Sequence, residues 1–230
     1  MPDKRYIQDF DLVKDYIVYR LINPDRNKKL LEDVPHISFL DLSIVFHCLA
    51  EKEQICTSSN LICNAHFAQL GVPLDMLYEA ASVNTQRILG YEIQTLHRVM
   101  CEMMGENPEK FDGVLLDKLE KGNLIFVISN NYRTEGAACM LYPKLIGNIA
   151  RTLGNNIYII PSSVNELLLL PAINDAQGIQ IRRSIREIND TGTKPEMILS
   201  YSLYYYDRGA EYENRIKIRG VMTNAYKDKI

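Results

Sequence analysis

The sequence lacks the signatures of the common enzyme classes. It has no G-x-x-x-x-G-K-[ST] phosphate loop, no G-x-G-x-x-G dinucleotide fingerprint and no G-x-S-x-G nucleophile elbow. Its four histidines show no H-E-x-x-H spacing, and its five cysteines form no C-x-x-C pair. We therefore expect neither a metal site nor a cofactor.

An export signal and a membrane span are also missing. Met1–Arg5 is followed by mixed polar sequence, and no run approaches the ~18 apolar residues that a span needs. The odd number of cysteines indicates free thiols in a reducing compartment. These absences predict a cytoplasmic protein without membrane contact.

Charge of either sign is nearly balanced, with 26 Lys and Arg against 29 Asp and Glu. The net charge of −3 gives no global attraction to nucleic acid or to anionic lipid. A chain of 230 residues with 47% hydrophobic content can bury a substantial core. We expect one large folded domain or two small ones.

The most apolar stretch runs from Ile157 to Ala172. Ile157–Ile160 and Leu167–Pro171 each have the length of a buried strand. A polar turn, Ser162–Glu166, separates them. This pair of strands is therefore predicted to lie at the centre of the fold.

Periodicity predicts the remaining elements. Apolar spacing of three and four predicts helices over residues 9–22, 60–70, 73–88, 92–104, 143–153 and 175–188. β-branched and aromatic runs predict further strands over residues 40–49, 55–58, 124–129, 136–141, 201–206 and 215–219. Hairpins dominate this order, so we expect an α+β fold with a mainly antiparallel sheet and helices on one face.

Residues 1–104 are predicted to form an N-terminal half, 105–122 a linker-like segment, 123–220 a C-terminal α+β half and 221–230 a tail. The two halves are also compatible with one compact domain. The order strand, turn, strand, helix occurs at residues 45–71 and again at 127–154. This is either an internal repeat or two ordinary hairpin-plus-helix units, and negligible identity between them favours the second interpretation.

The turn between the central strands holds the only candidates for catalysis, Ser162, Ser163 and Glu166. A hydrolase would need a base and an oxyanion hole beside the serine, and no glycine flanks these residues. Glu166 lies three residues after Ser163, which is the spacing of a capping box. The structural interpretation is therefore favoured over the catalytic one.

Basic and aromatic residues gather near the C-terminus. The candidate partner-binding residues are Arg182, Arg183, Arg186, Tyr204, Tyr206, Arg208 and Arg219. Residues 215–219 alternate charged and apolar side chains, as an edge strand does. This surface is predicted to contact a protein partner; weak binding of single-stranded nucleic acid is the alternative.

Five segments carry a family resemblance: DVPHISFLDLSIVFHCL, GVPLDMLYEAASVNT, GAACMLYP, YIIPSSVNELLLLPA and SLYYYDRG. On these, Asp9–Gly209 resembles an uncharacterised bacterial family that is known only as a domain of unknown function. The resemblance implies no activity. Relatives often have histidine where this chain has Asn165, which counts against catalysis at that turn. Many relatives also carry a further N-terminal segment, so the resemblance implies a shortened chain.

The leading hypothesis is a non-enzymatic protein-interaction or regulatory module, with a homodimer as one candidate assembly. A hydrolase or small-ligand enzyme centred on Pro161–Glu166 is the second hypothesis, and a weak nucleic-acid binder is the third.

Overall fold

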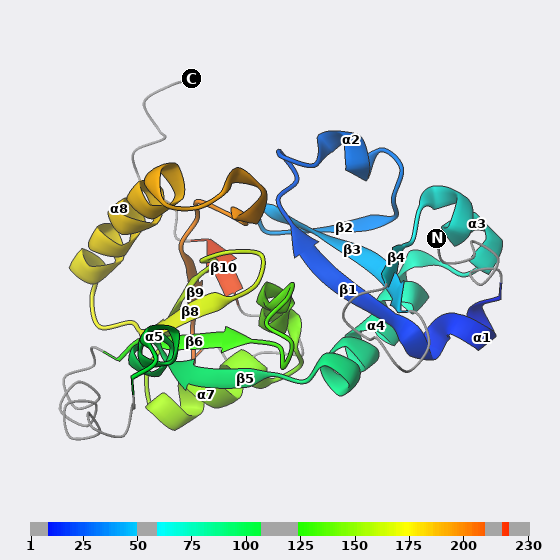
Figure 1. Ribbon diagram of the computed structural model, residues 1–230. Coiled ribbons are helices and arrows are strands. Elements are labelled where there is room, and N and C mark those ends of the chain that lie inside the picture. The colour runs from blue at the N-terminus through cyan, green and yellow to red at the C-terminus, as the bar shows by residue number, and fades with distance from the viewer. Residues whose placement is uncertain (1–8, 50–58, 107–123, 210–217, 221–230) are drawn as a thin grey trace.

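A computed structural model describes residues 9–49, 59–106, 124–209 and 218–220. These residues form two antiparallel sheets with helices around them (Figure 1). The α+β class and the antiparallel pairing are thereby confirmed. The strands form two sheets rather than one.

The first sheet has four strands and belongs to the N-terminal part of the chain. They are β1 (Ile17–Ile22), β2 (His36–Phe39), β3 (Leu42–Leu49) and β4 (Ser59–Leu61). The central strand β3 pairs with the other three and lies within the strand predicted at 40–49. The partner predicted at 55–58 lies outside the described residues, and β4 follows it directly.

The second sheet has six strands in the order β10-β9-β7-β8-β6-β5. Their bounds are β5 (Glu92–Thr95), β6 (Phe126–Ser129), β7 (Ile157–Ile160), β8 (Leu167–Pro171), β9 (Tyr204–Tyr206) and β10 (Ile218–Gly220). The predicted central pair, β7 and β8, has the predicted bounds. Among the described residues β10 pairs with β9 alone and so lies at the edge of the sheet; residues 215–217 of the strand predicted there lie outside the described residues.

Helices connect the strands. They are α1 (Phe10–Val13), α2 (Lys28–Leu31), α3 (Asn64–Leu70), α4 (Leu74–Leu89), α5 (Leu96–Met104), α7 (Leu145–Leu153) and α8 (Asp175–Thr191). Short 3₁₀ helices add η2 (Lys14–Tyr16), η4 (Gly136–Leu141) and η5 (Pro195–Met197). As the sequence predicts, Gly71 ends α3 in the left-handed conformation, and Pro73 lies just before α4.

The prediction of one long helix over residues 9–22 is wrong for the second half of that range. Asp9 does cap α1, because its carboxylate accepts a hydrogen bond from the Asp11 amide. Residues 17–22 instead form β1 and pair with β3. Ile17, Tyr19 and Leu21 satisfy a period of two as well as a helical one, and the β-branched and aromatic content favours the strand.

The helix predicted at 92–104 begins four residues late. Gly90, at φ +58°, ends α4, and residues 92–95 then pair with β6 as strand β5. The Thr95 side chain accepts a hydrogen bond from the Arg98 amide and so starts α5. The strand predicted at 201–206 likewise shortens to its last three residues.

The strand predicted at 136–141 is wrong: these residues form the 3₁₀ helix η4. All six are buried. A strand would direct alternate side chains to two faces, whereas η4 is enclosed by β1, β6, β8 and α7. The second hairpin is therefore absent, and the internal repeat is not confirmed.

Helices cover both faces of the six-stranded sheet, not one. Ile157 and Ile159 of β7 face the main core with α7 and η4. Tyr158 and Ile160 face the opposite side, where Ile181 and Ile185 of α8 pack. Continuous apolar runs such as β7 are typical of strands that are buried on both faces.

One apolar core joins the two sheets. It contains side chains of β1, β3 and α4 together with side chains of η4, β7 and β8. Tyr19 lies inside it, fully buried and stacked on Tyr78 with ring centroids 6.1 Å apart. Among the described residues, the Tyr19 hydroxyl has no hydrogen-bond partner.

Tyr19→Phe is expected to raise the free energy of unfolding by about 1 kcal/mol, because it removes a buried hydroxyl that makes no hydrogen bond. Tyr142→Phe is the matched control. The Tyr142 hydroxyl donates to the Thr85 carbonyl at 3.3 Å, so this change should lower stability by about 1 kcal/mol. Urea denaturation of both variants measures the difference, and a destabilised Tyr19→Phe would contradict the expectation.

Candidate functional site

The loop between β7 and β8 uses its polar groups to hold its own shape. The Ser163 hydroxyl accepts a hydrogen bond from the Asn165 amide at 3.1 Å, and the Ser163 amide donates to the Glu166 carbonyl at 3.3 Å. The Ser162 amide donates to the Ile160 carbonyl. Ser163 thus stabilises its turn, although it starts no helix, so the arrangement is a serine turn rather than a capping box.

Asn165 connects this loop to the loop after β6. Its carbonyl accepts a hydrogen bond from the Ser129 hydroxyl at 2.7 Å, and its side-chain oxygen accepts one from the Glu135 amide at 3.0 Å. The Ala137 amide also donates to the Val164 carbonyl. The two loops are therefore interlocked, and displacing one would break the hydrogen bonds of the other.

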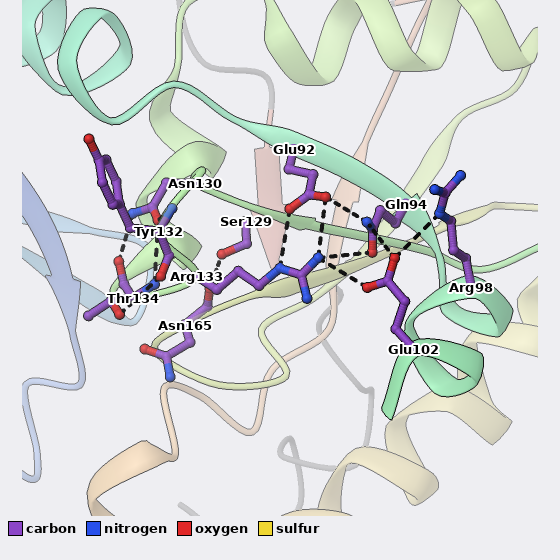
Figure 2. Close-up of polar contacts among 10 residues, drawn as sticks. All are labelled: Glu92, Gln94, Arg98, Glu102, Ser129, Asn130, Tyr132, Arg133, Thr134 and Asn165. Carbon is purple, nitrogen blue, oxygen red and sulfur yellow. Dashed lines mark hydrogen bonds and ion pairs between the residues drawn. The ribbon is translucent and has the colours of Figure 1, made fainter. Parts of the chain in front are cut away.

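The loop after β6 is built around the buried side chain of Asn130. This side chain accepts hydrogen bonds from the Tyr132 and Thr134 amides and donates to the Thr134 carbonyl (Figure 2). Arg133 and Glu135 adopt positive φ angles of 53° and 55°, which residues other than glycine rarely do. Such strain occurs where the surrounding structure imposes the conformation.

Arg133 points from this loop across β5, as Figure 2 shows. Its guanidinium donates to both carboxylate oxygens of Glu92 at 3.2 and 3.3 Å, and to Glu102 of α5 at 3.3 Å. Arg98 also donates to Glu102, at 3.4 Å. Desolvation raises the pKa of Glu102, but the hydrogen bonds from Arg133 and Arg98 outweigh it and leave that pKa lowered.

Little space remains beside this cluster. The cavity that Glu92, Arg133 and Glu166 line has a volume of about 30 Å³. This is room for about one water molecule and not for a substrate. The two arginines balance the two glutamates in charge, so the Arg133 cluster is best understood as a clamp that holds the strained loop against β5.

A larger hollow lies elsewhere, between the segment Asp9–Asp15 and α4. We call it the α1–α4 groove; it is open and has a volume of about 740 Å³. Its apolar lining consists of Phe10, Leu70, Val72, Met76, Ala80 and Val83. Its carboxylates are those of Asp9, Asp11, Asp15 and Glu79, against the single ammonium group of Lys14.

Hydrogen bonds from side chains of α4 to the backbone of the opposite wall fix the shape of the groove. The Asn84 side chain donates to the Lys14 carbonyl at 2.6 Å and to the Ile17 carbonyl at 3.1 Å. Arg87 donates to the Asp15 carbonyl at 2.7 Å. These bonds tie α4 to η2, so the two walls keep a fixed separation.

Sequence reasoning missed the groove because it predicted one helix over residues 9–22. The sequence of α4 nevertheless carries a signal for an exposed apolar surface, which is a second apolar stripe beside the one that faces the core. Leu77 and Ala81 face the core, whereas Met76, Ala80 and Val83 follow at i, i+4 and i+7 along a second stripe. Val83 is 66% exposed and Met76 44% exposed, so this stripe is not covered by the fold.

The predicted partner-binding residues do not form one surface. Arg183 and Arg186 of α8 and Arg208 after β9 are exposed. Tyr204 is fully buried and its hydroxyl donates to Asp41, so a partner cannot reach it. Arg219 lies on the edge strand β10.

Two of the predicted residues face inward in different places. Tyr206 packs against the main core, on the face of the sheet opposite α8. One guanidinium nitrogen of Arg182, Nη1, is buried and has no hydrogen-bond partner among the described residues. The exposed arginines of α8 are therefore separated from the tyrosines with which the sequence grouped them.

The described cysteines are free thiols: Cys48, Cys63, Cys101 and Cys139. Burial raises the pKa of Cys48 to about 11 and that of Cys139 to about 12, so both stay protonated at neutral pH. Within the described ranges, no group of three His, Cys, Asp or Glu side chains could hold a metal ion.

In the part of the chain that the structure describes, no helix combines the length and apolar character needed to cross a bilayer. A protein-family model described as "Family of unknown function (DUF5688)" matches residues 2–208. No curated protein and no solved structure matches the chain.

Proposed function

The chain belongs to DUF5688, a family of unknown function, and we propose that this member is a non-enzymatic protein-interaction module. Its binding site is the α1–α4 groove, and its ligand is a basic, amphipathic segment of a protein. The observation that carries the proposal is that one open hollow combines an exposed apolar stripe with four carboxylates.

The apolar stripe supplies the affinity. Met76, Ala80 and Val83 present a row of side chains along α4, and an amphipathic helix recognises such a row through apolar residues at the same spacing. Covering Val83, which is 66% exposed, removes apolar area from water. An exposed row of this kind on a folded protein is characteristic of a binding surface.

The carboxylates supply the selectivity. Asp11 already pairs with Lys14 at 2.8 Å, whereas Asp15 and Glu79 make no ion pair among the described residues. Carboxylates at a rim attract cationic partners and repel phosphate. The groove therefore favours a basic protein segment over nucleic acid.

The hydrolase hypothesis draws less support. The Ser163 hydroxyl is engaged with a backbone amide of its own turn, and the cavity beside Glu166 is too small for a substrate. A nucleophile would need a base within reach of its hydroxyl and room for an acyl group. Ser163 and Glu166 therefore support the loop rather than chemistry.

Titration with a synthetic helical peptide tests the proposal. A peptide with a leucine stripe and a lysine face should bind saturably and shift the amide resonances of α1 and α4. The same peptide with glutamate in place of lysine should bind at least about tenfold more weakly, because the rim repels it.

Two variants localise the binding. Val83→Arg should weaken the lysine peptide about tenfold, since it replaces an apolar contact with a like charge. Ile173→Arg alters a side chain that is 52% exposed outside the groove, and it should leave the affinity unchanged. Equal affinity for wild type and Val83→Arg would show that the groove is not the site.

A further inference from the structure

Met76 places a thioether in the wall of the α1–α4 groove. Of the lining side chains that the structure describes, it is the only one that contains sulfur, and it is 44% exposed. Ala80 and Val83 continue the apolar stripe from it along α4. A change in the polarity of the Met76 side chain therefore acts directly on the surface to which the proposed ligand binds.

Hydrogen peroxide oxidises a thioether in a two-electron step. A sulfur lone pair attacks one peroxide oxygen, so that an S–O bond forms and the O–O bond breaks. The displaced hydroxide takes the proton of the transferred oxygen and leaves as water. The product is methionine sulfoxide, which turns a flexible apolar side chain into a polar one.

Three of the four described thiols are protected from the same oxidant. Peroxide reacts with the thiolate, and burial raises the pKa of Cys48 to about 11 and that of Cys139 to about 12. Cys101 is only 1% exposed. Cys63 is half-buried and does not line the groove. Among the described residues, methionine is therefore the sulfur side chain that peroxide can change in the groove.

The charge of the groove selects the oxidant. Glu79 lies one turn after Met76 on α4, and the carboxylates of Asp9, Asp11 and Asp15 line the same hollow. These groups repel anionic oxidants such as hypochlorite. Hydrogen peroxide is neutral and small, and it can enter an open hollow of about 740 Å³.

Oxidation of Met76 leaves the fold in place but changes the free energy of binding. Leu77 and Ala81, which are fully buried, hold α4 in the core. The exposed position of Met76 allows water to solvate a sulfoxide oxygen while the groove is empty. An apolar ligand side chain that covers Met76 would remove this water without replacing its hydrogen bonds, which is costly.

We propose that Met76 is a modification site, and that its reversible oxidation by hydrogen peroxide switches off ligand binding in the α1–α4 groove. This inference rests on the proposed function and names its regulation. The reduced protein binds its basic, amphipathic ligand, and the sulfoxide form releases it. Reduction of the sulfoxide restores the apolar stripe and, with it, binding.

Graded peroxide treatment followed by peptide mapping measures the oxidation of each methionine separately. Met76 should be oxidised, as should Met103, which is 83% exposed on α5, whereas Met140, at 2% exposure in the core, should stay reduced. The lysine peptide contains no sulfur and is added after the peroxide has been removed. Its Kd should rise about tenfold or more, in proportion to the sulfoxide at Met76 and not to that at Met103.

Reversal identifies the oxidised group. Methionine sulfoxide reductases MsrA and MsrB act on one sulfoxide epimer each, so both together should restore binding. Dithiothreitol alone is the matched control. It reverses reversible thiol oxidation but leaves methionine sulfoxide, so it should not restore binding.

Two variants localise the effect, each compared in its oxidised form with its own reduced form. Met76→Leu keeps an apolar side chain without sulfur, and peroxide should leave its peptide affinity unchanged. The matched control replaces the exposed methionines of α5, Met100, Met103 and Met104, by leucine. This control should lose affinity on oxidation as wild type does.

Three results would overturn the inference. They are a Met76 that stays reduced while Met103 is fully oxidised, a Met76 sulfoxide that binds the peptide like the reduced protein, and a Met76→Leu protein that peroxide still inactivates. In each of these cases a reduced wild type that binds the peptide keeps the proposed function intact. If the reduced wild type does not bind the peptide, both proposals fail.

Discussion

Gly136→Ala is expected to lower the free energy of unfolding by about 4 kcal/mol or more, enough to unfold much of the protein at 25 °C. An added Cβ at this position would collide with the Ser129 hydroxyl, and would lie 2.5 Å from the Asn165 carbonyl oxygen and 2.7 Å from the Asn130 amide nitrogen. Two of these three neighbours are backbone atoms. Relief would require movement of the interlocked loops.

Gly192→Ala is the matched control. Gly192 ends α8 at φ −120°, and a Cβ there would meet only the Ile188 carbonyl, at an ordinary distance of 3.4 Å. This change should alter stability by less than about 0.5 kcal/mol. Thermal and urea unfolding of the two variants measures the contrast. A Gly136→Ala protein as stable as Gly192→Ala would mean that the loops are not interlocked.

Asp41→Ala is expected to lower the free energy of unfolding by about 3 kcal/mol. Asp41 lies in the turn between β2 and β3, and its carboxylate accepts hydrogen bonds from Ser200 at 2.6 Å, Ser202 at 2.9 Å and Tyr204. Burial and the neighbouring carboxylate raise the pKa of Tyr204, so its hydroxyl remains a donor at any ordinary pH. Without Asp41, that buried hydroxyl loses its acceptor.

A double-mutant cycle with Tyr204→Phe separates this effect from a general loss of packing. If the buried hydroxyl carries the cost, Asp41→Ala should destabilise the Tyr204→Phe protein by at least about 1 kcal/mol less than it destabilises wild type. Asp41→Asn should be milder than Asp41→Ala, because the amide keeps an acceptor oxygen. Additive effects of the two substitutions in urea denaturation would contradict this account.

The sequence predicts those elements well whose pattern has one interpretation. β7 and β8 are short apolar runs between prolines or polar residues, and α8 begins at a capping residue, Asn174, and has a clear period. Prediction from the sequence fails where the helical period and the strand period fit the same residues. Residues 17–22 satisfy both helical and strand spacing, and only the pairing with β3, more than 20 residues later, selects the strand.

Long-range packing also determines the conformation of η4 and the shape of the α1–α4 groove. Gly136-Ala137-Ala138 carries no local signal for a 3₁₀ helix, and the enclosure by two sheets determines its shape. Ser163 could be placed in a turn from sequence, because a hydroxyl that caps its own turn is a local feature. The α1–α4 groove could not, since its walls come from segments about 60 residues apart that meet only in the fold.

The shared core also constrains the order in which the chain matures on the ribosome. The inward side chains of β1 are covered by η4, whose first residue, Gly136, is synthesised more than a hundred residues after Leu21. At translation rates of about 5–20 residues per second, Tyr19 and Leu21 wait roughly 6–23 s for that cover. α4 is synthesised earlier and packs on β1 through Tyr78, so only the part of the first sheet that η4 covers stays exposed during this interval.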